Sequence, residues 1–144
     1  MLSNTSRYAI RALIYLAINS DKAKIGIKKI AEDLNIPSPF LGKILQTLAK
    51  QKVLDSTKGP NGGFSISKES QKTLLIDIIK IIDGDDLFDK CLVSNRTCTD
   101  MKGRPCALHS HYEEIRKKIT AMFSDHSIAD LAKEFSDAGG AIDI

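Results

Sequence analysis

The sequence predicts a mainly α-helical fold with one small β-hairpin and a long helix towards the carboxyl end. Three observations predict it. Apolar residues in the first half of the chain recur at the spacing of amphipathic helices. A stretch rich in glycine, with one proline, lies between two short alternating segments, which is typical of a tight hairpin. A narrow apolar seam follows later, which is typical of a helix that pairs with another helix.

The first predicted helix spans about Thr5 to Asn19. Four apolar residues follow the i, i+3, i+4, i+7 rule and form one buried stripe: Ile10, Leu13, Ile14 and Ala17. Arg7 and Arg11 lie off that stripe, so both can face solvent or phosphate.

Two short helices should follow, joined by a tight turn. Ile27–Leu34 has helical spacing, and the Pro37-Ser38-Pro39 sequence then breaks the chain. Ser38 is expected to cap the third helix, with Pro39 at its first position. The third helix should turn its polar and basic side outward: Phe40, Lys43, Gln46, Thr47 and Lys50. This pattern predicts a helix-turn-helix, with a plain helical hairpin as the alternative.

The next segment predicts a β-hairpin. Val53–Thr57 and Gly63–Ser67 alternate like strands, and Lys58–Gly63 supplies the glycines and proline of a tight turn. A basic hairpin after a helix-turn-helix predicts a winged helix that binds DNA. The residues expected to approach DNA are Arg7, Ser38, Pro39, Phe40, Lys43, Lys58, Gly59, Pro60, Asn61 and Gly62.

The second half of the chain predicts more helix. A fourth helix spans about Leu74 to Asp83, and Asp83–Asp89 is expected to be an acidic, polar linker. A last short helix should run from Ser127 to Phe135 with a capping box closed by Asp130, before a loose tail from Ser136 to Ile144. The long helix between them has a 4, 3, 4, 3 seam suited to a symmetric dimer: Leu108, Tyr112, Ile115, Ile119 and Met122. Packing on the chain's own core is the alternative.

These elements divide the chain into three parts. Residues 1–84 form the predicted DNA-binding domain, 85–106 a cysteine-containing sensor loop, and 107–144 the dimerisation helix with its carboxy-terminal segment. The charge follows this division. Residues 1–68 hold 11 Lys and Arg against 4 Asp and Glu, a net +7, whereas residues 69–144 hold 10 against 14, a net −4. A basic first half favours a polyanionic partner.

Composition narrows the class of protein. A chain of 144 residues with 42% hydrophobic residues fits a globular domain with a modest extension. We expect a cytoplasmic protein without a membrane segment, since no apolar run approaches the ~20 residues that a membrane helix needs. An enzyme is not expected, because the sequence has no nucleophile–base set, phosphate-binding loop or paired carboxylates.

The three cysteines lie together. Cys91, Cys98 and Cys106 share one stretch, and His109 follows three residues after the last. An odd, clustered set argues against a secreted disulfide framework. Thiolates and an imidazole on one loop are typical of a metal or iron–sulfur site. A zinc site and a metal-free thiol switch remain open, although the C-x2-4-C knuckle of many zinc sites is absent.

Taken together, these motifs resemble those of the IscR/NsrR-type (Rrf-two) family of bacterial winged-helix transcription regulators. The resemblance rests on Arg7-Tyr8-Ala9 in the first helix, the helix-turn-helix, the wing Lys58–Phe64 and the three cysteines, and it covers roughly residues 1–135. It implies a homodimer, usually a repressor, that binds a palindromic DNA site. It also implies an iron–sulfur cluster, held by Cys91, Cys98, Cys106 and His109, that controls DNA affinity. Some nitric-oxide-sensing members of this family take an N-terminal acidic residue of the other subunit as the fourth ligand. Residues 1–11 here contain no Asp or Glu, so the resemblance favours His109 as the fourth ligand and a 2Fe–2S centre over a 4Fe–4S one.

The sequence departs from the family in the residues that touch DNA. Lys58 replaces an arginine common in the wing, and lysine cannot form a two-pronged contact with guanine. Gly42 stands where the family member that regulates iron–sulfur assembly has an acidic residue that tunes base choice. Target sequences should therefore not transfer. The alternative from another class is a protein-interaction module without sequence-specific DNA binding.

Overall fold

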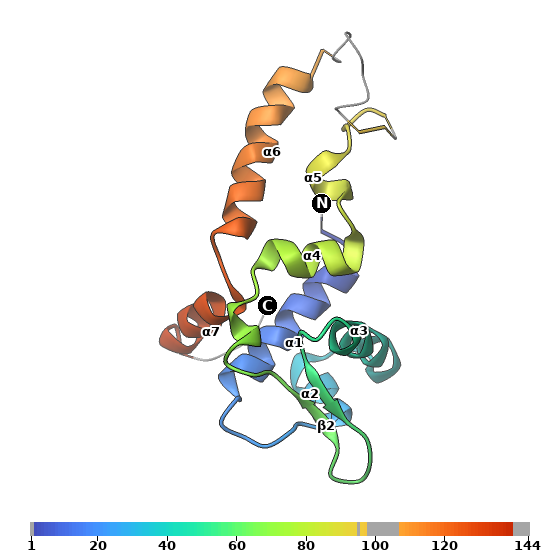
Figure 1. Ribbon diagram of the computed structural model, residues 1–144, viewed down its shortest axis with the longest axis vertical. Coiled ribbons are helices and arrows are strands. Elements are labelled where there is room, and N and C mark those ends of the chain that lie inside the picture. Colours follow the sequence, from blue (N-terminus) through green and yellow to red (C-terminus); the bar gives the residue numbers. More distant parts are fainter. Residues whose placement is uncertain (1, 95, 98–106, 140–144) are drawn as a thin grey trace.

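The computed structural model describes residues 2–94, 96–97 and 107–139 and shows a mainly helical chain with one two-stranded hairpin (Figure 1). The predicted fold class is therefore confirmed. In chain order the elements are α1 (Asn4–Ile18), α2 (Ile27–Leu34), α3 (Ser38–Lys50), β1 (Asp55–Thr57), β2 (Gly63–Ser65), a 3-10 turn (Ser70–Lys72), α4 (Leu75–Asp83), α5 (Asp86–Asp89), α6 (His109–Ser124) and α7 (Ile128–Asp137).

Helix α1 lies at the centre of the fold and packs against α3, α4 and α7 (Figure 1). Its stripe supplies Leu13, which has no exposed surface. The core also takes fully buried residues from other helices: Ile30, Leu45, Ile78 and Ile128. Helix α7 thus shares one core with the predicted residues 1–84, although it comes last in the chain. The boundaries at 84 and 106 stay a prediction.

The carboxy-terminal helix begins as its capping box predicts. Ser127 accepts a hydrogen bond from the Asp130 amide, while the Asp130 carboxylate accepts one from the Ser127 amide. The helix runs to Asp137, so the tail expected from Ser136 begins inside it. Residues 140–144 lie outside the described part of the chain.

The hairpin is shorter than predicted and has a third partner. Strands β1 and β2 pair antiparallel, with Ser56 opposite Phe64. Ile25, between α1 and α2, bridges Phe64 through two backbone hydrogen bonds of 2.9 Å. A Cβ on Gly63 would lie 2.5 Å from the Ile25 carbonyl oxygen, so this close approach needs glycine. Val53 and Ile66, at the outer ends of the predicted strands, are buried in the core outside the hairpin.

The start of α3 differs from the prediction by one residue. Ser38 is the first helical residue and Pro37 holds the cap position, so Pro39 is the second residue of the helix. The amides of Phe40 and Leu41 donate to the Pro37 carbonyl at 3.1 and 3.0 Å. The prediction that Ser38 caps α3 was wrong. Asn35 already ends α2 in the left-handed conformation (φ 52°), so the turn between the two helices ends at Pro37, one residue earlier than predicted.

The acidic segment after α4 is more than a linker. It contains the short helix α5, whose Phe88 is buried and meets Phe123 of α6 edge to face, with ring centroids 6.4 Å apart. Arg116 of α6 also donates to the Asp89 carbonyl oxygen at 3.4 Å. Helices α5 and α6 are therefore joined, and together they rise from the body as an arm (Figure 1).

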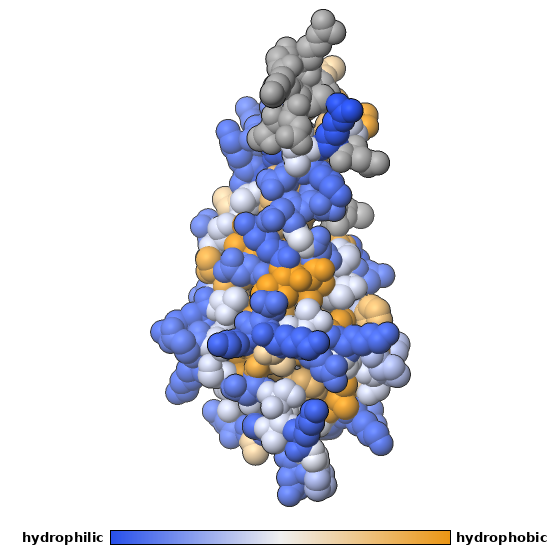
Figure 2. All heavy atoms as spheres, turned by 45° about the vertical axis from the view of Figure 1, so that its right-hand side comes forward, coloured by the Kyte–Doolittle hydropathy of each residue, from blue (hydrophilic) through white to orange (hydrophobic). Residues whose placement is uncertain are grey.

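Helix α6 has no buried residue. Two predicted seam residues, Ile115 and Met122, are 54% and 50% exposed, and Leu108 just before the helix is 51% exposed. Figure 2 shows an arm covered largely by hydrophilic side chains on the face that it presents, with apolar side chains gathered lower, at mid-height.

Candidate nucleic-acid interface and cysteine loop

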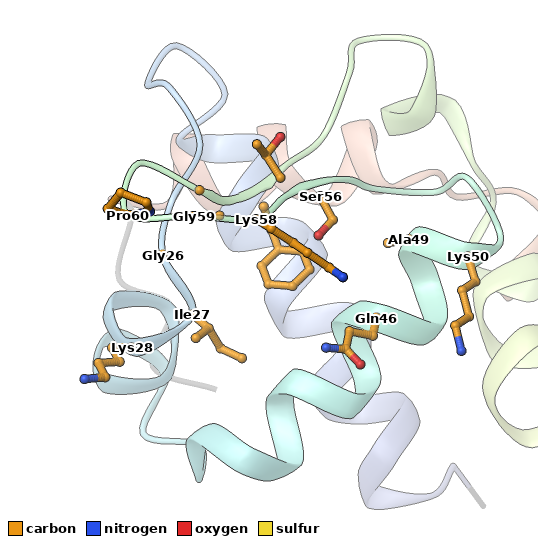
Figure 3. Close-up of a pocket in the computed structure, with 14 residues that line it drawn as sticks. Gly26, Ile27, Lys28, Gln46, Ala49, Lys50, Ser56, Lys58, Gly59 and Pro60 are labelled. Atoms are coloured by element: carbon orange, nitrogen blue, oxygen red, sulfur yellow. The ribbon is translucent and has the colours of Figure 1, made fainter.

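A groove of about 980 Å³ separates the wing from α3 and the start of α2. Lys28, Lys50 and Lys58 line it, one from each of these elements, and no acidic residue does. Figure 3 shows Lys58 reaching from the wing across the groove towards α3, with Gln46 projecting from the helix. Three cations in a groove without carboxylates favour an anionic chain as its occupant.

The tip of the wing is tight enough for close contact with a backbone. Gly59 has a φ of +106°, and the Gly62 amide donates to its carbonyl oxygen at 2.9 Å. A Cβ on Gly62 would lie only 2.1 Å from the Thr57 carbonyl oxygen. The glycines therefore keep the tip narrow. Of the predicted wing residues, Lys58, Gly59, Pro60 and Gly62 line this groove, and Asn61 lines the opposite side of the hairpin.

The predicted residues of α3 lie along its outer side, starting from its first turn. Pro39, Phe40 and Lys43 are exposed, and Ser38 is half-buried. The Phe40 ring packs edge to face on Tyr8 of α1, with centroids 5.7 Å apart. This contact ties the beginning of α3 to the central helix.

The two arginines of α1 behave differently. Arg7 is exposed and lies beside Leu131 and Phe135 of α7, on a cavity of about 580 Å³. Arg11 is half-buried and donates to the Leu34 carbonyl oxygen at 2.8 Å, at the last residue of α2. The expectation that Arg11 faces solvent or phosphate was therefore wrong, because its guanidinium satisfies a helix end.

A polar pair joins α1 to α2. Tyr15 donates to the Asp33 carboxylate at 2.6 Å, and Lys29 pairs with the other carboxylate oxygen at 2.7 Å. Burial, together with this hydrogen bond, raises the pKa of Tyr15 to about 12. Hydrogen bonds from Lys29 and Tyr15 lower the pKa of Asp33. The helix-turn-helix is thus held on α1 by Asp33 as well as by Arg11.

A second polar contact joins the end of α4 to the start of α1. The Asp83 carboxylate accepts from the Ser3 amide at 3.1 Å and from the Ser3 hydroxyl at 2.5 Å. Burial acts to raise the pKa of Asp83, but the hydrogen bonds from Ser3 outweigh it, so the net direction is downward. Ser3 also caps α1 through the Ser6 amide, which fixes the first turn of the central helix.

The described part of the cysteine loop lies at the end of the arm. Cys91 is 8% exposed, and its amide donates to the Arg96 carbonyl oxygen at 3.0 Å. His109 is the first residue of α6, and Cys91 follows closely after α5, the two helices of the arm that rises away from the wing (Figure 1). Cys98 and Cys106 lie outside the described residues. Within residues 2–94, 96–97 and 107–139, no three His, Cys, Asp or Glu side chains form a group that could hold a metal ion.

Sequence reasoning missed two lysines of the groove as site residues. Lys28 is the second residue of α2 and Lys50 is the last residue of α3, and only the fold brings them opposite the wing. The available signal was their place off the apolar stripes of both helices. Across the described ranges, no helix is long and apolar enough to cross a membrane.

Comparison with known proteins agrees with this geometry. Residues 2–134 match the model of the Rrf2 (Rrf-two) family, described as an iron-dependent transcriptional regulator. An HTH-type transcriptional regulator of Aquifex aeolicus is 38% identical over 131 residues, covering 91% of this chain and 90% of the relative.

Two solved structures share the fold. CymR, the global cysteine regulator of B. subtilis, aligns with a TM-score of 0.77 at 21% identity, covering 93% of this chain and 97% of that one. The structure of T. potens IscR aligns with a TM-score of 0.76 at 22% identity, covering 96% and 90% of the two chains.

Proposed function

The chain belongs to the Rrf2 family of transcriptional regulators, and from this premise we propose that it is a homodimeric repressor whose DNA affinity is controlled by an iron–sulfur cluster. Members of this family are transcriptional regulators and not enzymes, as the sequence predicted. The proposal has three parts, namely the DNA surface, the dimer and the cluster.

The groove between α3 and the wing carries the proposal for DNA. Lys28, Lys50 and Lys58 surround it without a carboxylate, and the glycine tip of the wing is narrow. Double-stranded DNA offers both a phosphate chain for the lysines and a groove for the hairpin. We assign α3 to the major groove and the wing to the neighbouring one, on a palindromic promoter site.

Helix α6 supports the dimer. A helix of 16 residues without one buried side chain gains too little from packing within one protomer to offset the conformational entropy lost when it is ordered. Two apolar residues of its seam, Ile115 and Met122, are also about half exposed. Pairing with the same helix of a second copy would cover that seam and place two DNA-binding units side by side.

The residues at the end of the arm fit an iron–sulfur group. Cys91 offers a sulfur shielded from solvent, and His109 offers an imidazole at the same end of the molecule. With Cys98 and Cys106 they would hold a 2Fe–2S cluster in preference to a 4Fe–4S one. Such a group, when bound, supplies a one-electron redox couple that reports iron, oxygen or nitric oxide.

A metal-free thiol switch is the second candidate. The likeness to CymR, named for cysteine regulation, favours it. The two candidates share the DNA surface and the dimer, and differ only in what the cysteines do. Zinc on the same donors is a third outcome of a metal assay.

The DNA-binding part is tested by titrating duplex DNA at several salt concentrations. We expect log affinity to fall steeply and linearly with log salt. Lys58→Ala should weaken binding to every duplex and reduce the slope by about 1 per protomer if Lys58 contacts a phosphate. Lys133→Ala, on the exposed side of α7, is the matched control and should change neither quantity.

Two results would contradict this part of the proposal. An affinity for duplex DNA that does not change with salt concentration would exclude a groove that contacts phosphates. A protein that binds no duplex at any salt concentration, yet forms a stable complex with another protein, would favour the interaction module.

A further inference from the structure

Gln46 is the one amide side chain on the outer face of α3, and it projects into the groove opposite the wing (Figure 3). It is exposed, and its amide makes no hydrogen bond to any of the described residues. An amide carries two donors and an acceptor, so this side chain holds its full hydrogen-bonding capacity ready for a partner in the groove.

The neighbouring side chains of α3 cannot do the same work. The Thr47 hydroxyl donates to the Lys43 carbonyl oxygen at 2.9 Å and so is already used within the helix. Lys43 and Lys50 are point charges, which suit phosphate better than a base edge. Gly42, one turn before Gln46, has no side chain, and a Cβ there would lie 3.0 Å from the Ile27 side chain.

We propose that Gln46 reads a base: in each half-site its amide contacts N6 and N7 of one adenine in the major groove. Glutamine is suited to adenine because its carbonyl accepts from the N6 amine while its amine donates to N7. The proposal rests on the proposed DNA-binding function. It gives the chain a determinant of sequence choice on the same face of α3 as the vacant position 42, one turn further along.

The test selects duplexes from a random pool with the full-length protein and then substitutes each base pair of the enriched site in turn. Wild type should require an A·T pair at one position of each half-site, losing roughly 5- to 150-fold in affinity when it is replaced. Gln46→Ala should lose this preference at that position alone and keep its affinity for random duplex within about 2-fold. Thr47→Ala is the control and should keep the preference.

A second variant tests the assignment by gain of function. Gln46→Arg should move the preferred pair at the same position from A·T to G·C, because arginine contacts O6 and N7 of guanine. The proposal is overturned if Gln46→Ala weakens all duplexes equally, which would make Gln46 a phosphate contact, or if its base preferences equal those of wild type. If wild type enriches no sequence, the proposed function itself fails, and this outcome differs from both.

Discussion

At the scale of single residues, the structure places polar side chains where helices must be joined. Tyr15 donates to Asp33, Arg11 donates to the end of α2, and Ser3 donates to Asp83. Two of these contacts link α1 to α2, and the third links Ser3, the cap of α1, to the end of α4. None follows from the periodicity of the sequence, because periodicity reports which face is buried and not which polar tips meet.

The Tyr15 contact gives a direct prediction. Tyr15→Phe keeps the buried ring and removes the hydrogen bond to the charged Asp33, so the free energy of unfolding should fall by about 1 kcal/mol. Urea denaturation measures it. Tyr8→Phe is the matched control, since the Tyr8 ring packs on Phe40 while its hydroxyl makes no hydrogen bond to the described residues.

The same pair sets a pH dependence with a definite sign. Because the pKa of Tyr15 is raised to about 12, its contribution is complete below about pH 10 and is lost as pH rises towards 12. Because the pKa of Asp33 is lowered, its contribution is complete above about pH 4 and is lost as pH falls further. The difference in the free energy of unfolding between wild type and Tyr15→Phe should therefore be constant from about pH 5 to about pH 9 and shrink on both sides of that range. A difference that grows in alkali would contradict the assignment.

At the scale of elements, the sequence predicts those helices that have a clear apolar stripe. The stripes of α1 to α4 and the capping box of α7 give their positions within one or two residues. Helix α5 was missed because it has only four residues, two of them acidic, and only Phe88 is buried. The strands were predicted too long because Val53 and Ile66 are buried in the core. The alternation of apolar and polar residues therefore continues beyond the residues that pair in the hairpin.

The candidate site was predictable in part for the same reason. The wing residues come from a local turn pattern, and the exposed side of α3 comes from its stripe. Lys28 and Lys50 join the groove only through tertiary packing. The roles of Cys98 and Cys106 stay a prediction, since both lie outside the described residues.

The arm gives the prediction at this scale. Ile115→Lys places a charge in the proposed seam, where the wild-type side chain is 54% exposed, so it should separate the dimer without unfolding the protomer. We expect the mass in sedimentation to halve and operator affinity to drop at least ~10-fold, as loss of one half-site contact requires. Ala121→Lys introduces the same charge on another face of α6 and should leave the dimer intact. A dimer that survives Ile115→Lys but not Ala121→Lys would contradict the seam.

At the scale of the whole molecule, the wing lies at one end, while α5 and the start of α6, which flank the cysteine loop in the sequence, lie towards the other (Figure 1). Packed contacts connect them. Phe88 joins α5 to α6, Asp83 joins α4 to α1, and Tyr8 joins α1 to Phe40 at the start of α3. The proposed control of DNA affinity requires that these contacts have two arrangements, one for each state of the loop. The family predicted from the sequence is confirmed, and the finer question is what the cysteines hold.

Whether an iron–sulfur cluster controls DNA affinity is tested on protein purified without oxygen. Iron, sulfide and zinc are assayed, the visible spectrum is recorded, and operator affinity is measured beside a Cys98→Ala control. We expect about two iron and two sulfide per protomer, visible absorption bands that are lost in the control, and an operator affinity that differs between the two proteins. A colourless, iron-free protein whose operator affinity equals that of Cys98→Ala would contradict control by a cluster.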